Sequence, residues 1–216
     1  MTHQERLTAF RRADLYVVIT EAFCAGRTAL EILEKTLAAG VRLVQLREKE
    51  LPGRRHYELA LAFRRLTSSA GALLIINDRL DIALAAGADG VHLGQEDLPV
   101  AVARRLAPDL IIGASTHSLA EALAAQEAGA SYVNIGPIFP TQTKPEAQYL
   151  GPEALETIVP HLRIPWTTMG GITAANIVQV VSRGARHPAV MTAVTAASDV
   201  TPAAQELRRL ILAYRA

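Results

Sequence analysis

The sequence predicts an α/β protein, a single-domain (β/α)8 barrel of the TIM type, and three observations predict it. Short runs of β-branched and other apolar residues alternate with stretches of helical spacing along the whole chain. A total of 216 residues suits one such barrel. A Gly-Ala pair also recurs where a helix should end before the next strand, at Gly87, Gly129 and Gly184.

A doubly wound open sheet is the alternative for the same alternation. Sheets of that kind that bind dinucleotides carry a glycine-rich fingerprint directly after the first strand, and none follows residues 15–20 here. The barrel is therefore favoured. We expect one domain over residues 1–216, with a short helical extension at about residues 3–12 before the first strand.

The first half of the chain should hold four strand–helix pairs. The run LYVVIT is apolar and β-branched, as a buried parallel strand requires, and Gly40 and Gly71 each follow a stretch of helical spacing. Pro99 suits the first turn of the fourth helix. The strands are predicted at residues 15–20, 42–46, 73–76 and 90–93, and the helices at about 27–39, 55–70, 80–86 and 99–107.

The second half repeats the pattern around one long loop. Residues 136–150 form the longest stretch without periodicity, and Gly170-Gly171 directly follows an apolar run. The strands are predicted at residues 110–114, 132–135, 166–169 and 189–192, and the helices at about 119–128, 152–159, 174–183 and 202–214.

Composition excludes several classes of protein. The net charge is +1, and the arginine pairs are scattered over predicted helices, so neither nucleic acid nor a membrane is an expected partner. Cys24 is the only cysteine, which excludes an intramolecular disulfide framework. The N-terminus shows no signal-like apolar run. We therefore expect a cytoplasmic protein, and the sequence leaves a homo-oligomer open.

Carboxylates follow two successive strands in the segment 75–98. Asn77-Asp78 comes directly after one predicted strand, and Asp97 comes shortly after the next. Because parallel neighbouring strands end at the same edge of a barrel, we expect Asp78 and Asp97 to converge. Two carboxylates suit Mg²⁺ when a phosphate supplies further oxygens. The alternative is that each aspartate caps the helix that follows it.

The loop after the second strand offers donors for a polyphosphate. Gln45, Arg47 and Lys49 alternate along the chain and should share one face. A solvated charged turn is the alternative for this string. After the fifth strand, Ser115 can donate to phosphate together with backbone N–H groups, although Ser118 or His117 could instead begin the following helix.

The loops after the last three strands supply further donors, and those after the seventh and eighth strands predict a second, uncharged phosphate site. Thr141, Thr143 and Lys144 offer donors between prolines in the long loop. Gly170-Gly171 lets backbone amides approach a ligand closely, and Thr192 follows the last strand. Phosphate sites of barrel enzymes favour the last two loops.

Covalent catalysis is not expected, because no Cys–His or Ser–His–Asp arrangement emerges. His92 is interpreted as a packed or hydrogen-bonded barrel residue. The inventory favours substitution at a diphosphate ester, in which the protein neutralises the leaving group and positions the reactants.

Taken together, these segments resemble the thiamin phosphate synthase family over essentially the whole chain. The ordered set is specific, although any one motif is modest. The matching segments are LYVVIT, QLREK, INDRLDIALAAGADGVHLGQEDL, GASTHS, GPIFPTQTK and the GGI after the seventh strand.

The resemblance implies a barrel enzyme that joins a hydroxymethylpyrimidine diphosphate to a thiazole phosphate and releases diphosphate, with Mg²⁺. It implies that Asp78 and Asp97 bind Mg²⁺. The residues expected to hold the pyrimidine diphosphate are Gln45, Arg47, Lys49, Asn77, Ser115 and Lys144, of which Arg47, Lys49, Ser115 and Lys144 would be catalytic. Those expected to hold the thiazole phosphate are Thr141, Thr143, Gly171 and Thr192.

The chain departs from the family pattern at a few positions. Residues 184–188 read GARHP where a Gly-Ala-Asp/Glu-Gly turn is usual, Thr192 stands where serine is usual, and MGGI replaces IGGI. These changes are expected to affect the thiazole-phosphate end. Two other functions stay open: a thiazole tautomerase of the same superfamily, with His117 as base, and a barrel that binds a phosphorylated ligand without catalysis.

Overall fold

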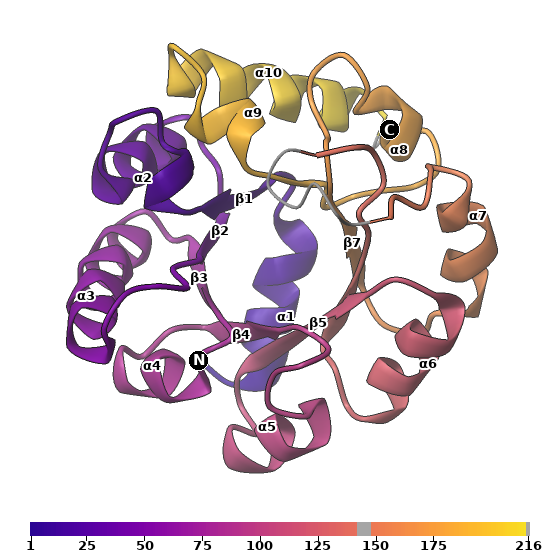
Figure 1. Ribbon diagram of the computed structural model, residues 1–216, viewed down its shortest axis with the longest axis horizontal. Coiled ribbons are helices and arrows are strands. Elements are labelled where there is room, and N and C mark those ends of the chain that lie inside the picture. The colour runs from indigo at the N-terminus through magenta and orange to yellow at the C-terminus, as the bar shows by residue number, and fades with distance from the viewer. Residues whose placement is uncertain (142–147, 215–216) are drawn as a thin grey trace.

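The computed structural model describes residues 1–141 and 148–214, and it forms a ring of eight parallel strands surrounded by helices (Figure 1). Neighbouring strands are hydrogen-bonded in the order β7-β6-β5-β4-β3-β2-β1-β8, and a single bridge between Thr168 and Pro188 closes the ring. The predicted (β/α)8 barrel is confirmed. The strands are β1 Tyr16–Ile19, β2 Leu43–Leu46, β3 Leu73–Asn77, β4 Gly90–Leu93, β5 Ile111–Thr116, β6 Tyr132–Ile135, β7 Trp166–Thr168 and β8 Ala189–Val190.

The helices lie mostly where the periodicity predicts them, outside the ring of strands. The α-helices are α1 His3–Arg12, α2 Ala29–Ala38, α3 Gly53–Ser69, α4 Leu80–Ala85, α5 Val100–Leu106, α6 Leu119–Glu127, α7 Ala154–Ile158, α8 Val178–Val181, α9 Thr192–Thr195 and α10 Val200–Ala213. Two 3-10 turns are η1 Glu21–Phe23 and η2 Val159–His161. None of the helices within the described ranges is long and apolar enough to cross a membrane.

Two boundaries in the last third of the chain differ from the prediction. The strand expected at residues 189–192 ends at Val190, because the backbone of Met191 (φ −124°, ψ −90°) leaves the extended region and Thr192 begins α9. The helix expected at residues 174–183 is reduced to α8. Its first residues form turns instead, in which the Asn176 side chain accepts a hydrogen bond from the Thr173 N–H. Such side-chain bonds compete with helix formation.

Helix α1 closes the end of the barrel at which the strands begin, and it is seen through the ring in Figure 1. Its Phe10 is fully buried and stacks on Tyr132 of β6, with ring centroids 4.7 Å apart. At its first turn, His3 contacts Ser131, the residue before β6, at 3.0 Å. Phe10, Tyr16 and Tyr132 belong to one buried cluster inside the barrel, so aromatic side chains fill the interior from below.

The unusual turn at residues 184–188 also lies at this lower end. It leads into the start of β8, and the ring of His187 packs against Phe10 at 5.0 Å. The turn itself therefore lies away from the rim loops, although Ala189 and Val190 directly after it line the cavity, and its expected effect on the thiazole-phosphate end stays a prediction. The two other departures, Met169 and Thr192, do lie at the rim.

Phe10 should contribute strongly to stability, because it joins α1 to the barrel interior. We predict that Phe10→Ala lowers the free energy of unfolding by about 3–5 kcal/mol, measured by urea denaturation. Phe10→Leu keeps most of the buried volume and should cost clearly less. A loss below about 1 kcal/mol for the alanine variant would contradict a structural role for α1.

Candidate active site

A cavity of about 200 Å³ opens at the rim where the strands end. It lies between the side chains that follow β2 to β5 on one side and the glycines that follow β7 on the other. Its lining includes ten of the residues expected from the sequence, namely Gln45, Arg47, Lys49, Asn77, Asp78, Asp97, Ser115, Thr141, Gly171 and Thr192. Thr143 and Lys144 lie outside the described residues.

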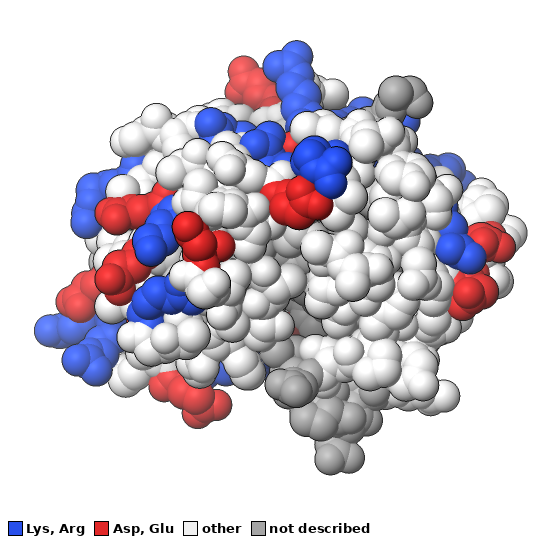
Figure 2. Space-filling model, turned by 90° about the horizontal axis from the view of Figure 1, so that it is seen from above, with Lys and Arg blue, Asp and Glu red and all other residues white. Residues whose placement is uncertain are grey.

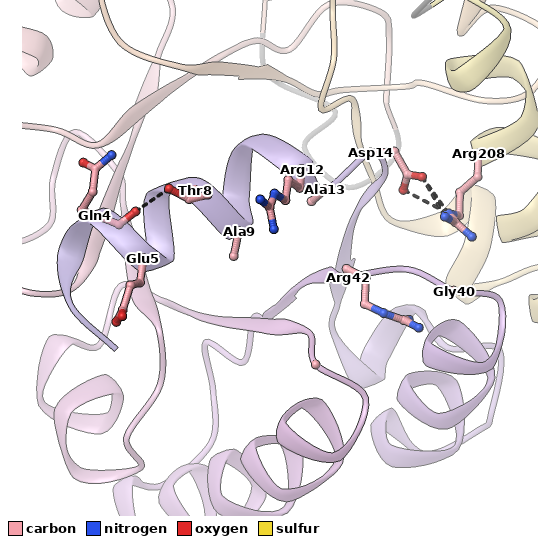
Figure 3. A pocket seen from close by; sticks show the side chains of 11 residues that line it. Gln4, Glu5, Thr8, Ala9, Arg12, Ala13, Asp14, Gly40, Arg42 and Arg208 are labelled. Atoms are coloured by element: carbon pink, nitrogen blue, oxygen red, sulfur yellow. Dashed lines mark hydrogen bonds and ion pairs between the residues drawn. The ribbon is translucent and has the colours of Figure 1, made fainter.

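A wider hollow, of about 570 Å³, lies at the opposite end of the barrel beside α1 (Figure 3). Arg208 of α10 is held there by Asp14, whose carboxylate oxygens accept bonds of 3.0 and 2.8 Å, and it donates to Ala39 O at 2.7 Å. These bonds tie the last helix to the start of β1 and to the end of α2. Because the lower face of such barrels serves stability, we assign the chemistry to the rim cavity.

The two aspartates of the rim lie side by side. Asp78 follows β3 in a left-handed conformation (φ +60°), and its N–H donates to His92 O at 2.8 Å. Asp97 accepts a hydrogen bond from Gly94 N–H at 2.7 Å. Helices α4 and α5 both begin without a side-chain cap. The alternative that these aspartates serve as helix caps is therefore wrong, and their carboxylates face each other and the cavity.

The electrostatics of this pair favour a cation. Burial, followed by the hydrogen bond with Asp97 and its negative charge, raises the pKa of Asp78 to about 6, while Lys49 and Arg47 act in the opposite direction. Lys49 Nζ lies 3.7 Å from Asp78 Oδ2. Within the described ranges, no group of three or more His, Cys, Asp or Glu side chains is close enough to hold a metal. Two carboxylates fit Mg²⁺, which keeps several waters and takes phosphate oxygens as further ligands.

A buried chain of hydrogen bonds crosses the barrel beneath the cavity. Gln45 Nε2 donates to Tyr16 OH at 2.6 Å, and Tyr16 OH lies 3.1 Å from Tyr132 OH. Tyr132 OH lies 2.9 Å from His92 Nδ1, and His92 Nε2 lies 2.9 Å from Ser115 Oγ. His92 is thus the hydrogen-bonded barrel residue that the sequence suggested.

The two tyrosines in this chain of hydrogen bonds, Tyr16 and Tyr132, remain protonated. Burial raises the pKa of both Tyr16 and Tyr132 above the ordinary value. Gln45 donates to Tyr16. If Tyr16 in turn donates to Tyr132, and Tyr132 donates to His92 Nδ1, then His92 carries its proton on Nε2 and donates to Ser115. The Ser115 proton is then left to point toward the cavity.

The other end of the cavity is built from backbone. Gly170 and Gly171 have φ values of +102° and +63°, which favour glycine. A Cβ on Gly171 would lie 2.3 Å from Pro140 O, so no larger residue fits. Thr192 lies at the start of α9, beside these glycines. This end carries donors without formal charge.

Some lining residues are not expected from the sequence. Asn134 of β6 lines the cavity, as do Met169, Thr173 and Met191. For Asn134 a signal does exist: it is a polar residue in a buried strand, two positions after Tyr132, so both must face the barrel interior. His117 lies at the edge of the cavity, where its Nδ1 lies 3.0 Å from Glu121 Oε2.

The face of the molecule seen from above carries charges of both signs (Figure 2). On the side shown in Figure 2, basic and acidic side chains are interspersed among larger uncharged areas. The expectation, from a net charge of +1, that nucleic acid is not a partner stays a prediction.

The fold and the rim together define a class: (β/α)8 barrel enzymes that bind phosphate esters at the C-terminal ends of their strands. The family model for thiamine monophosphate synthase matches residues 15–194. The chain belongs to this family. 

Individual relatives are similar in sequence to this chain over nearly its full length. The chain is 48% identical to a thiamine-phosphate synthase from Chloroflexus aurantiacus, over 91% of this chain and 92% of that one. It is also 48% identical to one from Methanoculleus marisnigri, over 94% and 97%. A solved structure of thiamine phosphate pyrophosphorylase from Pyrococcus furiosus is 39% identical and superposes with a TM-score of 0.90, over 96% of this chain and 100% of that one.

The carboxylate pair should destabilise the metal-free protein. Because the folded-state pKa of Asp78 is raised, stability falls as pH rises from its ordinary pKa toward about 6, and the full penalty is present at pH 7.5. We predict that Asp78→Asn raises the Tm in EDTA at pH 7.5 by about 2–4 °C, on the order of 1 kcal/mol.

The same variant should lose most of the rise in Tm that Mg²⁺ gives the unsubstituted protein. Glu96→Gln is the matched control, since it removes an exposed carboxylate from the loop after β4, the loop that carries Asp97. A lower Tm for Asp78→Asn in EDTA, or an unchanged response to Mg²⁺, would count against the metal assignment.

Proposed function

We propose that this protein is a thiamin phosphate synthase, which joins 4-amino-5-hydroxymethyl-2-methylpyrimidine diphosphate to 4-methyl-5-(2-phosphoethyl)thiazole and releases diphosphate. The observation that carries the proposal is the division of one cavity into two unlike ends. Asp78, Asp97, Arg47 and Lys49 gather at one end, and backbone donors around Gly170-Gly171 lie at the other. A reaction between a diphosphate ester and a separate phosphate ester requires both.

The charged end suits a departing diphosphate. Arg47 and Lys49 would neutralise negative charge that develops on the leaving group, and Ser115 would donate its hydroxyl proton to a diphosphate oxygen. Lys144 is proposed for the same role. Bound Mg²⁺, held by Asp78 and Asp97, would act as a Lewis acid on the diphosphate.

The proposed reaction requires no general base to remove a proton from the nucleophile, the thiazole nitrogen. The attacking thiazole nitrogen carries none. In the dissociative substitution that we propose, the bond from the pyrimidine methylene carbon to the diphosphate oxygen breaks first, and the nitrogen then attacks the cation that the aminopyrimidine ring stabilises. This agrees with a site whose tyrosines are kept protonated by burial. The residues instead bind and orient two reactants, which is a large part of catalysis in such displacements.

The uncharged end suits the thiazole phosphate. Backbone N–H groups near Gly171, with Thr141, Thr143 and Thr192, would bind the phosphate oxygens without adding a second cluster of cations. Gln45 and Asn77 would contact the pyrimidine diphosphate from β2 and β3.

A thiazole tautomerase is the second candidate, because the His117–Glu121 pair at the cavity edge has the form of a base with an orienting carboxylate. A tautomerase would need no diphosphate leaving group and no metal. The Asp78–Asp97 pair beside Lys49 therefore favours the synthase.

Both proposed substrates carry charges that keep them from crossing a bilayer, so we propose that the enzyme works in the cytoplasm, where they are dissolved.

The direct test is release of diphosphate with each substrate alone and with both, in the presence and absence of Mg²⁺, with thiamin phosphate followed as product. Release that requires both substrates and Mg²⁺ supports the synthase. Conversion of the thiazole phosphate alone, abolished in His117→Ala, would support the tautomerase. Binding of either compound without turnover would leave a non-catalytic barrel.

Ser115 should matter to turnover more than to stability. We predict that Ser115→Ala lowers kcat/KM for the pyrimidine diphosphate more than tenfold, which corresponds to about 1.4 kcal/mol. Ser118→Ala is the matched control, because Ser118 caps α6 outside the cavity lining and should lose stability but keep activity. Equal activity in the two variants would remove Ser115 from the proposed mechanism.

A further inference from the structure

Asn134 lies in the middle of the site and has no role in the mechanism above. In the parallel register of the barrel it pairs with Ser115 of β5 on one side and with Thr167 of β7 on the other. Its side chain lines the cavity although the residue is only 3% exposed. A polar side chain at this depth needs partners for its carbonyl oxygen and for its amide nitrogen.

The carbonyl oxygen has its partner in Thr167. The Thr167 hydroxyl donates to Asn134 Oδ1 at 2.8 Å, and Thr167 is fully buried. A hydroxyl proton in such a place must find an acceptor, and Oδ1 is the acceptor that the described residues provide. This fixes the amide with its oxygen toward β7.

The amide nitrogen is thereby left facing the cavity. Within the described part of the chain, the bond with Thr167 is the only hydrogen bond of the Asn134 side chain. A desolvated N–H donor without a partner is unfavourable, so the two N–H groups are best served by a ligand or by the water that it displaces.

The surroundings define the ligand group that these donors would meet. Below Asn134 lie the rings of His92 and Tyr132, stacked on each other at 26°, and Met169 lines the cavity beside it. The charged side chains Arg47 and Lys49 follow β2 at the far wall of the barrel. A flat, uncharged ring with an acceptor nitrogen in its edge matches an aromatic floor and a neutral donor.

We infer that Asn134 donates a hydrogen bond to a ring nitrogen of the aminopyrimidine, and that Thr167 is the positioning residue that holds its amide in the donating orientation. The inference rests on the proposed function, because it takes the pyrimidine diphosphate as the ligand. It makes Asn134 a specificity determinant that distinguishes a pyridine-type nitrogen from a C–H group at the same place.

The test measures binding rather than turnover, because a ring nitrogen also affects the reactivity of the methylene carbon. Kd values are determined by calorimetry with Mg²⁺ for the pyrimidine diphosphate and for its two analogues in which one or the other ring nitrogen is replaced by C–H. We expect the unsubstituted protein to bind one analogue at least about tenfold more weakly. Asn134→Ala should bind the parent about tenfold more weakly and no longer discriminate against that analogue.

Thr167→Val should lose part of the affinity and part of the discrimination, because the Asn134 amide is still present but its orientation is no longer fixed by the Thr167 hydroxyl. Thr116→Val is the matched control: its buried hydroxyl bonds to the backbone carbonyl of Asn134, and it is not part of the cavity lining. It should keep the discrimination of the unsubstituted protein. Circular dichroism and the Kd for thiazole phosphate, which should stay within about twofold, show that each variant is folded.

The inference is overturned if Asn134→Ala binds the parent as tightly as the unsubstituted protein, or weakens both analogues as much as the parent. It is also overturned if only the thiazole phosphate Kd changes. If these results occur while the unsubstituted protein makes thiamin phosphate, the proposed function stands without this residue. If the unsubstituted protein neither binds the pyrimidine diphosphate nor forms product, the proposed function fails and the inference with it.

Discussion

The rest of the structure depends on the way the inside of the barrel is filled. A barrel of eight strands has room for side chains and must bury them without leaving polar atoms unpaired. Here Tyr16 and Tyr132 fill the space above Phe10, and Gly113 makes it available, since a Cβ there would lie 2.2 Å from the Tyr132 ring. Each tyrosine brings a hydroxyl into the core, and pairing those hydroxyls requires Gln45 and His92. Packing therefore dictates the chain of hydrogen bonds that ends at Ser115.

The same arrangement separates the charged chemistry from the core. Lys49 and the two aspartates follow strands at the rim, where water can reach them and Lys49 is about half exposed. The barrel interior below them holds uncharged donors and acceptors, among them the chain from Gln45 to Ser115 and the pair of Thr167 and Asn134. Charge at the rim strengthens contacts with diphosphate, while a neutral interior suits a heteroaromatic ring. The fold thus provides a charged, hydrated environment for the proposed diphosphate group and a neutral, buried environment for the ring.

The sequence predicts most of the fold because strand periodicity and helix-ending glycines are local signals. It also predicts that Asp78 and Asp97 meet, since parallel strands end at one rim. It does not predict β8 or α8 well, because the backbone turn at Met191 and the Asn176 side-chain bond depend on contacts rather than on periodicity. Asn134 is missed because alternation does not show which face of a fully buried strand lines the barrel, so that the polarity of this one residue is the signal that marks the inner face.

Departures from a family pattern carry information only once their place in the fold is known. The turn at residues 184–188 differs most in sequence, yet it lies beneath the barrel, where His187 packs on Phe10 and can adjust to α1 without reaching the rim. Asn134 and Thr167, by contrast, pair with each other one layer above Tyr132, and Asn134 also pairs with Ser115. A change at either would alter a donor inside the cavity while leaving the carboxylates in place. Residues in that layer, rather than the residues of the turn, are where this chain can differ from its relatives in what it recognises.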